Sequence, residues 1–320
     1  MWHKKFKFYY FVKNFIRLIT PHWMCQIKKT RLLSRLKNHD QEYIFKRVNY
    51  YNKLTGTTLS ESSTPLSDFK FRGSRSAYFF DTNEFTRLFS KDLRVNLLFG
   101  DITYIPDEAS IVKSRPIGDN NQNSVILNLD KFRHFTFIKD KRDFSKKKNL
   151  LVGRGHVGPR KPTRIKFLEK YFDHPMCDIG KTNKGGEISD YWLVDRMTID
   201  EQLEYKFILC WEGNDVASNL KWVMSSNSIA VTPKPRYETW YMEGTLIPDY
   251  HYIAVNDDLS DLEEKLIYYS NHIEASNKII ANAHRYIQQF QNKEREKIIS
   301  TLVLEKYFDK TGQKASKQHQ

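Results

Sequence analysis

Cysteine is scarce in this chain of 320 residues, with three copies at Cys25, Cys177 and Cys210. Their odd number, wide separation and lack of a CxxC spacing argue against a disulfide framework and a structural zinc site, and fit a reducing compartment. The histidines show no HExxH or similar spacing either. We therefore expect no metal site.

Long hydrophobic runs are also missing. No segment approaches the roughly 18 consecutive apolar residues of a transmembrane helix. The basic N-terminus is not followed by the clean apolar region and small-residue cleavage site of a secretory signal, so we expect none. The motifs GxGxxG and GxxxxGK[ST] do not occur, which disfavours a dinucleotide enzyme and a P-loop kinase.

Acidic residues are absent from the first 39 positions, whose ten lysines and arginines supply ten of the formal net charge of +14. Aromatic and aliphatic residues such as Phe6, Phe15 and Ile19 are interleaved with these cations. Residues 1–40 therefore read as a basic aromatic arm suited to an anionic membrane surface. The alternative is a helix packed on the fold with a solvated basic face. The remaining chain has no basic stripe or RNA-binding motif, so nucleic acid is not an expected partner.

The second half of the chain alternates between strand and helix patterns. The expected strands are 150–152, 176–179, 205–211, 229–231 and 251–255, with helices at 164–172, 198–204 and 217–224 between them and two more within 258–290. Alternating βα units imply a parallel sheet covered on both faces. The sequence thus predicts an α/β fold.

The first half is less regular. The pattern predicts a helix over 43–51, a second helix capped by Asp81 or Thr82, and strands at 95–99, 111–112, 125–129 and 135–138. The charged stretch 139–149 separates a domain of residues 41–145 from one of residues 146–290. Residues 291–320 are expected to form a C-terminal helix followed by a disordered tail.

Three glycine turns follow expected strands: Gly100-Asp101, Gly153-Arg154-Gly155 and Glu212 to Asp215. Ligands of open α/β sheets bind beyond the carboxyl ends of the strands, so these turns are expected to line one cleft. The last turn opens a strand–turn–helix–strand unit, where backbone N–H groups can hold a phosphate.

The order of residues from Tyr205 to Gly244 resembles the signature of glycosyltransferase family 90. That family includes protein O-glucosyltransferases, fungal capsule-associated proteins and bacterial lipopolysaccharide core glycosyltransferases, and the likeness is strongest to the bacterial branch. Further family elements are similar to FRGSR (71–75), RVNLLFGDITYIP (94–106), IVKSRP (111–116) and KKKNLLVGRG (146–155).

The resemblance implies a set of site residues. Asp101 falls on the catalytic aspartate and Glu238 on an acidic residue that meets the donor ribose or sugar. The implied nucleotide-site residues are Arg154, Gly155, Gly213, Asp215, Ala217, Ser218 and Lys221. The implied acceptor-site residues are Arg72, Lys113, Ser114 and Arg115.

The chain departs from the family pattern at three positions next to these residues. His156 and Val157 stand where the family often has serine and arginine, and Asn219 stands where many relatives have arginine. Lys221, or Arg236 nearby, is then expected to supply the positive charge.

The fold implied is GT-B-like, with two Rossmann-like halves whose parallel sheets face a cleft. Residues 41–145 would be the acceptor side and residues 146–290 the nucleotide-sugar side. The implied activity is inverting transfer of a hexose from UDP-glucose or UDP-galactose to a lipopolysaccharide inner-core sugar, with Asp101 as general base. No DxD triplet occurs, so we expect no metal and no other cofactor, with Arg, Lys and helix dipoles neutralising the pyrophosphate.

The expected location is cytoplasmic, peripheral on the inner face of the plasma membrane. A capsule or protein O-glycosyltransferase is the alternative within the same class. From another class, the alternative is a non-catalytic, membrane-associated polyanion-binding protein.

Overall fold

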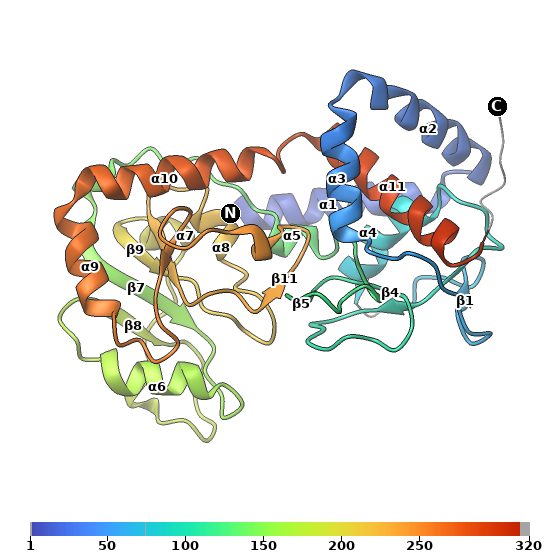
Figure 1. Ribbon diagram of the computed structural model, residues 1–320. Coiled ribbons are helices and arrows are strands. Elements are labelled where there is room, and N and C mark those ends of the chain that lie inside the picture. Colours follow the sequence, from blue (N-terminus) through green and yellow to red (C-terminus); the bar gives the residue numbers. More distant parts are fainter. Residues whose placement is uncertain (1, 74, 314–320) are drawn as a thin grey trace. The chain divides into compact units, whose positions relative to one another are not determined.

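The structure, a computed structural model, describes residues 2–73 and 75–313, with side chains from Tyr9 onward (Figure 1). The chain forms two compact units. Unit 1 combines the residues up to His134 with Tyr237–Glu243 and the chain from Phe290 on, and unit 2 comprises Phe135–Arg236 and Gly244–Gln289. The C-terminal helix thus belongs to unit 1.

Unit 2 contains a five-stranded sheet in which every strand pair is parallel. Its strands are β7 (Lys148–Gly155), β8 (Cys177–Lys181), β9 (Tyr205–Leu209), β10 (Ile229–Thr232) and β12 (Ile253–Ala254). They lie in the order β12-β10-β9-β7-β8. This confirms the predicted α/β fold with a parallel sheet, and all five expected strands are present.

Helices cover this sheet. They are α6 (Pro162–Tyr171), α7 (Ile199–Gln202), α8 (Leu220–Val223), α9 (Leu262–Asn271) and α10 (Ile273–Gln288). In Figure 1, α6 and α10 lie on opposite sides of the sheet. Helix α7 begins with a capping box in which Thr198 and Glu201 bond each other's backbone N–H groups, and this satisfies two otherwise unpaired donors.

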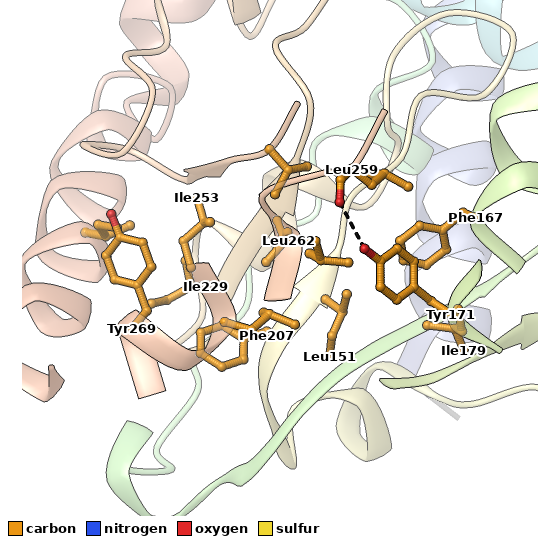
Figure 2. Close-up of a cluster of buried hydrophobic side chains, with 14 of the residues drawn as sticks. Leu151, Phe167, Tyr171, Ile179, Phe207, Ile229, Ile253, Leu259, Leu262 and Tyr269 are labelled. Carbon is orange, nitrogen blue, oxygen red and sulfur yellow. Dashed lines mark hydrogen bonds between the residues drawn. The ribbon is translucent and has the colours of Figure 1, made fainter. Parts of the chain in front are cut away.

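The core of unit 2 lies between the sheet and its helices. Figure 2 shows Leu151 from β7 beside Tyr171 from α6, and Phe207 from β9 belongs to the same cluster. The Tyr171 hydroxyl donates to the Leu259 carbonyl at 2.9 Å, so its one polar atom is satisfied inside the core. Each fully buried side chain of this size contributes about 1.5–3 kcal/mol.

Unit 1 is mainly helical around small sheets. Its helices are α1 (Trp2–Ile19), α2 (His22–Ser34), η1 (Arg35–Asn38), α3 (Gln41–Tyr51), α4 (Ser76–Thr86), α5 (Lys131–His134) and α11 (Lys293–Lys310). A parallel sheet has the order β3-β4-β6, from Leu97–Leu98, Ser110–Val112 and Ser124–Ile126. Two antiparallel pairs join β1 (Thr64–Pro65) to β2 (Arg94–Val95), and β5 (Arg115–Pro116) to β11 (Tyr237–Glu238). Both units contain parallel sheets, and the GT-B arrangement expected of them stays a prediction.

A buried ion pair joins α3 to α11 in unit 1. Arg47 donates to both oxygens of Glu296, at 2.6 and 2.9 Å. The Trp240 indole N–H donates to the same carboxylate at 2.6 Å, and the Tyr51 ring stacks on Trp240 with centroids 3.9 Å apart. The C-terminal helix is therefore anchored by charge as well as by apolar packing.

Three local predictions for the first half were wrong: the cap at Asp81 or Thr82, the strand 95–99 and the strand 135–138. The first concerns α4, which begins at Ser76, after Arg75 in a left-handed conformation (φ 47°). Asp81 is instead a buried mid-helix residue that accepts from the Lys131 N–H and from the Tyr10 hydroxyl, both at 2.9 Å. Asp81 therefore bonds residues that are distant in sequence, whereas the local pattern had predicted that it caps the helix.

The expected strand 95–99 is divided at Asn96, because Val95 pairs with β1 while Leu97 pairs with β4. The expected strand 135–138 is irregular, and the Ile138 N–H bonds the Ser225 hydroxyl at 3.0 Å rather than a neighbouring strand. The chain enters unit 2 at Phe135, before the expected boundary at 145. One reason is that Asp140 binds Lys147 Nζ at 2.6 Å and the Asn227 N–H at 3.1 Å, both in unit 2.

The expected basic arm forms α1 and α2, and both pack on unit 1. Arg17 pairs with Glu84, and Arg87 donates to the Thr20 carbonyl at 2.8 Å. Large apolar side chains are exposed on these helices among the cations: Ile19 is 81% exposed and Trp23 64%. No helix in the described part of the chain is both long and apolar enough to cross a bilayer. Lys4, Lys5 and Lys7 lie outside the described side chains, and the expected disordered tail lies outside the described residues from 314 on.

Candidate functional site

A cavity of about 330 Å³ opens at the carboxyl ends of β7 and β9 in unit 2. From β7 the chain runs to β8 on one side, whereas from β9 it runs to β10 on the other. The two loops diverge and leave a crevice, which is where open α/β sheets bind ligands. The lining residues are Gly153, Arg154, Gly155, His156, Val157, Arg164, Phe167, Leu168, Ile179, Gly180, Ile199, Gln202, Leu209, Trp211, Gly213, Val216, Ser218, Asn219 and Trp222.

Arg164, which the sequence did not single out, holds the two loops together. Its guanidinium donates to the carbonyls of His156 (2.8 Å), Trp211 (3.1 Å) and Glu212 (3.2 Å). These acceptors are uncharged, and burial lowers the pKa of Arg164, as expected of a cation without a facing carboxylate. The cavity therefore has a fixed positive charge that no described carboxylate neutralises.

Two glycines allow this approach. A Cβ on Gly155 would lie 3.3 Å from the Arg164 guanidinium, and a Cβ on Gly153 would lie 3.0 Å from the Leu209 side chain. The expected glycine turn is thus needed for close packing at the end of β7. The sequence signal for Arg164 was available, because a cation two residues after Pro162, near the start of the next helix, lies close to the turn.

Arg154 lines the same cavity, but its charge is already paired. It donates to the Asp178 carbonyl at 2.6 Å and to its carboxylate at 2.5 Å. Burial favours the neutral form of Asp178, yet hydrogen bonds from Tyr205 and Arg154 hold its pKa below the usual value. Arg154 thus braces β7 against β8, and its donor contact stays a prediction.

The other expected nucleotide-site residues divide into two groups. Gly155, Gly213 and Ser218 line the cavity, whereas Asp215, Ala217 and Lys221 are buried and are not among its lining residues. Burial raises the pKa of the Cys210 thiol, and the charge of Lys221 opposes that shift. Asn219, at the position where many relatives have arginine, lines the cavity and donates to the Leu209 carbonyl at 2.9 Å.

In unit 1, Asp101 follows β3 and Gly100, whose φ of 128° favours glycine. Its carboxylate accepts from Lys113 Nζ at 2.5 Å, and Arg133 approaches to 3.7 Å. The Asp101 side chain is 25% exposed and that of Lys113 is 1% exposed. The buried Lys113 thus contacts a carboxylate that reaches solvent. The two residues meet because β3 and β4 are neighbouring parallel strands, whose carboxyl ends lie at the same edge of the sheet.

The residues expected to bind acceptor have other contacts. Ser114 bonds both the N–H and the carbonyl of Ile102 at 3.2 Å, which fixes the loop after Asp101. Arg115 is fully buried and pairs with Glu238 at 2.8 Å. The Tyr50 hydroxyl donates to the second Glu238 oxygen. Arg72 is exposed. The roles assigned to the four acceptor-site side chains and to Glu238 stay predictions.

Arg133 is a second cation that the sequence did not single out. It pairs with Asp130 at 2.8 Å, and its side chain is about half exposed. Within the described residues, no three His, Cys, Asp or Glu side chains gather as a metal site.

Comparison with known proteins agrees with the sequence resemblance. Residues 174–316 match a family model described as glycosyl transferase family 90. The chain is 40% identical over 310 residues to the O-glucosyltransferase LpsA of Dichelobacter nodosus, and the alignment covers 96% of each chain.

Proposed function

The chain belongs to glycosyltransferase family 90, and we propose that it transfers glucose or galactose from a UDP-sugar to an inner-core sugar of lipopolysaccharide. The observation that carries the donor half of this proposal is the cavity where the loops after β7 and β9 diverge. The relative's name, O-glucosyltransferase, favours glucose.

The cavity has the features that a nucleotide diphosphate requires. Arg164 is a fixed cation at its wall, which suits a diphosphate because guanidinium groups bind phosphate oxygens strongly. Trp211 and Trp222 line it as well, and their rings offer apolar faces to a uracil or a sugar. A volume of about 330 Å³ lies within the range of small-molecule sites.

Asp101 is the group that best suits the chemical step. The acceptor hydroxyl oxygen attacks the anomeric carbon, its proton passes to Asp101, and the bond from that carbon to the diphosphate oxygen breaks. UDP leaves with the negative charge, which Arg164 offsets. A single displacement of this kind inverts the anomeric centre. Lys113 orients Asp101, because its buried side chain donates to that carboxylate at 2.5 Å.

The N-terminal helices support the proposed acceptor and location. We propose that α1 and α2 rest on the anionic inner face of the plasma membrane, where a lipid-linked acceptor is found. Exposed Ile16, Ile19, Trp23 and Ile27 would enter the interface, and nearby cations would face anionic headgroups.

Purified protein should be incubated with UDP-glucose or UDP-galactose, with and without core-truncated lipopolysaccharide. We expect UDP release to rise with acceptor present, and the sugar to appear on the lipopolysaccharide by mass spectrometry. Transfer to a protein or a capsule polymer instead would favour the alternative enzyme class. Absence of UDP release with every donor, together with retained binding to lipopolysaccharide, would favour the non-catalytic polyanion-binding protein.

A further inference from the structure

A second cavity, of about 340 Å³, lies within unit 1 where α1, α2, α4 and α11 meet. Its polar lining comes from Arg17, Cys25, Lys28, Glu84, Arg87 and Lys297. Four of these six side chains are cations and one is a carboxylate. This cavity belongs to neither the donor cavity nor the Asp101 cluster.

The single carboxylate does not neutralise the cavity, because other cations already bind it. Glu84 pairs with Arg17 and, at 2.6 Å, with Lys131. Burial works against its ionisation, yet Lys131, Arg17 and Lys297 together lower the pKa of Glu84 to about 2. Lys131 also pairs with Asp81 at 3.3 Å, and the Asp81 carboxylate is not among the groups that line the cavity.

The remaining cations bond only uncharged groups or none. Arg87 donates to the Cys25 thiol at 3.2 Å and to the carbonyls of Thr20 and Arg17. Within the described residues, Lys28 and Lys297 form no ion pair and are exposed at the mouth of the cavity. Burial, then the like charges of Arg17 and Lys297, hold the pKa of the neighbouring Lys13 below its usual value. The cluster thus carries positive charge in excess.

We propose that this cavity binds the phosphate group of a phosphate monoester. Arg17 and Arg87 are held in place by their own hydrogen bonds, so they are preorganised donors at the wall. Lys28 and Lys297 supply mobile charge at the entrance, and a dianion suits such a set. The volume exceeds that of phosphate alone, so the ester group enters too. This inference does not depend on the proposed transfer reaction.

Two sources share this chemistry: the headgroup of an anionic lipid and a soluble or acceptor-borne phosphorylated sugar. The test uses the full chain, with glucose 6-phosphate as the soluble probe and phosphatidylcholine vesicles containing phosphatidic acid as the lipid probe. The cavity variant is Lys28→Gln with Lys297→Gln. The control is Arg31→Gln with Lys293→Gln, which removes the same charge from exposed positions of the same two helices outside the cavity.

We expect at least one probe to bind, by titration calorimetry or co-sedimentation, and the cavity variant to weaken that binding about ten-fold or more, since it removes two charge-assisted contacts. The control variant should bind as the wild type does. Loss confined to glucose 6-phosphate assigns the soluble source, and loss confined to vesicles assigns the lipid. Melting temperatures of both variants verify that they are folded.

Two results would overturn the proposal. One is that the wild type binds neither probe. The other is that the control variant loses as much affinity as the cavity variant, because the effect then belongs to net charge and not to this cavity.

Discussion

Asp101 and Lys113 form a contact whose strength depends on the charge of the carboxylate. The lysine is almost fully buried, whereas the aspartate reaches solvent. When Asp101 takes the acceptor proton, it loses the negative charge that Lys113 Nζ contacts. Arg133 at 3.7 Å is the second cation close to that carboxylate.

The first prediction concerns this base. Asp101→Asn keeps the shape and removes the proton acceptor, so the transfer rate should fall by about 10²–10⁴ with nearly unchanged UDP affinity. Rates are followed by UDP release and affinity by thermal shift. Asp107→Asn, an exposed carboxylate in the same loop, is the control and should keep full activity. A variant that loses UDP affinity instead would show that Asp101 is not the base.

The second prediction concerns Arg164. Arg164→Gln removes the unpaired charge of the donor cavity and one link between its two loops, so UDP should bind about ten- to a hundred-fold more weakly. Arg160→Gln removes a charge from an exposed position just before the same helix and should leave binding unchanged. Equal binding by wild type and Arg164→Gln, measured by calorimetry, would exclude Arg164 from the diphosphate site.

At the scale of elements, α3 and α11 depend on one buried ion pair. Arg47 is 2% exposed and Glu296 9%, and the Trp240 indole adds a third contact. Removing one partner of such a pair leaves the other charge buried without compensation, which costs more than the net contribution of the intact pair.

The third prediction follows from this pair. Glu296→Gln should lower the free energy of unfolding by about 3–5 kcal/mol, measured by urea unfolding with circular dichroism. The control is Glu305→Gln on the same helix α11, whose partner Lys29 on α2 lies 3.0 Å away. Its effect should be smaller, because both side chains of that pair are more exposed than Arg47 and Glu296. If both variants lose the same free energy of unfolding, burial does not determine how much an ion pair contributes to stability.

The fourth prediction concerns the exposed face of α1 and α2. Ile19→Ser with Trp23→Ser should reduce binding to anionic vesicles about ten-fold or more, because two side chains lose their burial in the interface. Ile267→Ser with Tyr268→Ser on α9 removes comparable exposed groups and is the control.

Binding by the wild type should also weaken as salt rises, since screening shortens the reach of the basic residues. If the α1–α2 variant co-sediments with anionic vesicles as well as the wild type does, these helices stabilise unit 1 and do not bind a membrane.

For the whole molecule, the proposed transfer takes its positive charge from side chains. The fifth prediction is that activity survives EDTA, because Arg164 rather than a metal offsets the charge of the leaving UDP. UDP release is measured with EDTA, with added Mg²⁺ and with added Mn²⁺, and the three rates should agree within about two-fold. Activity that disappears in EDTA and returns with Mn²⁺ would refute the metal-free clamp.

The sequence by itself determined the features that are encoded locally. Alternating apolar runs and helical patterns predicted the five parallel strands of unit 2. The residues around Tyr205–Gly244 predicted the family, which the comparisons confirm. Both results depend on neighbours within one element or on a contiguous motif, and such information is present in the order of residues alone.

Only the tertiary structure decided which side chains meet. Arg115 and Glu238 are 123 residues apart in the chain and pair through β5 and β11, while Lys221 is buried instead of lining the donor cavity. Arg164 contacts the loops after both β7 and β9, and those loops diverge because β8 and β10 lie on opposite sides of the β7–β9 pair. No periodicity records the order of strands in a sheet, since that order is set by the packing of distant segments. The partners of a charged side chain are set by the same packing.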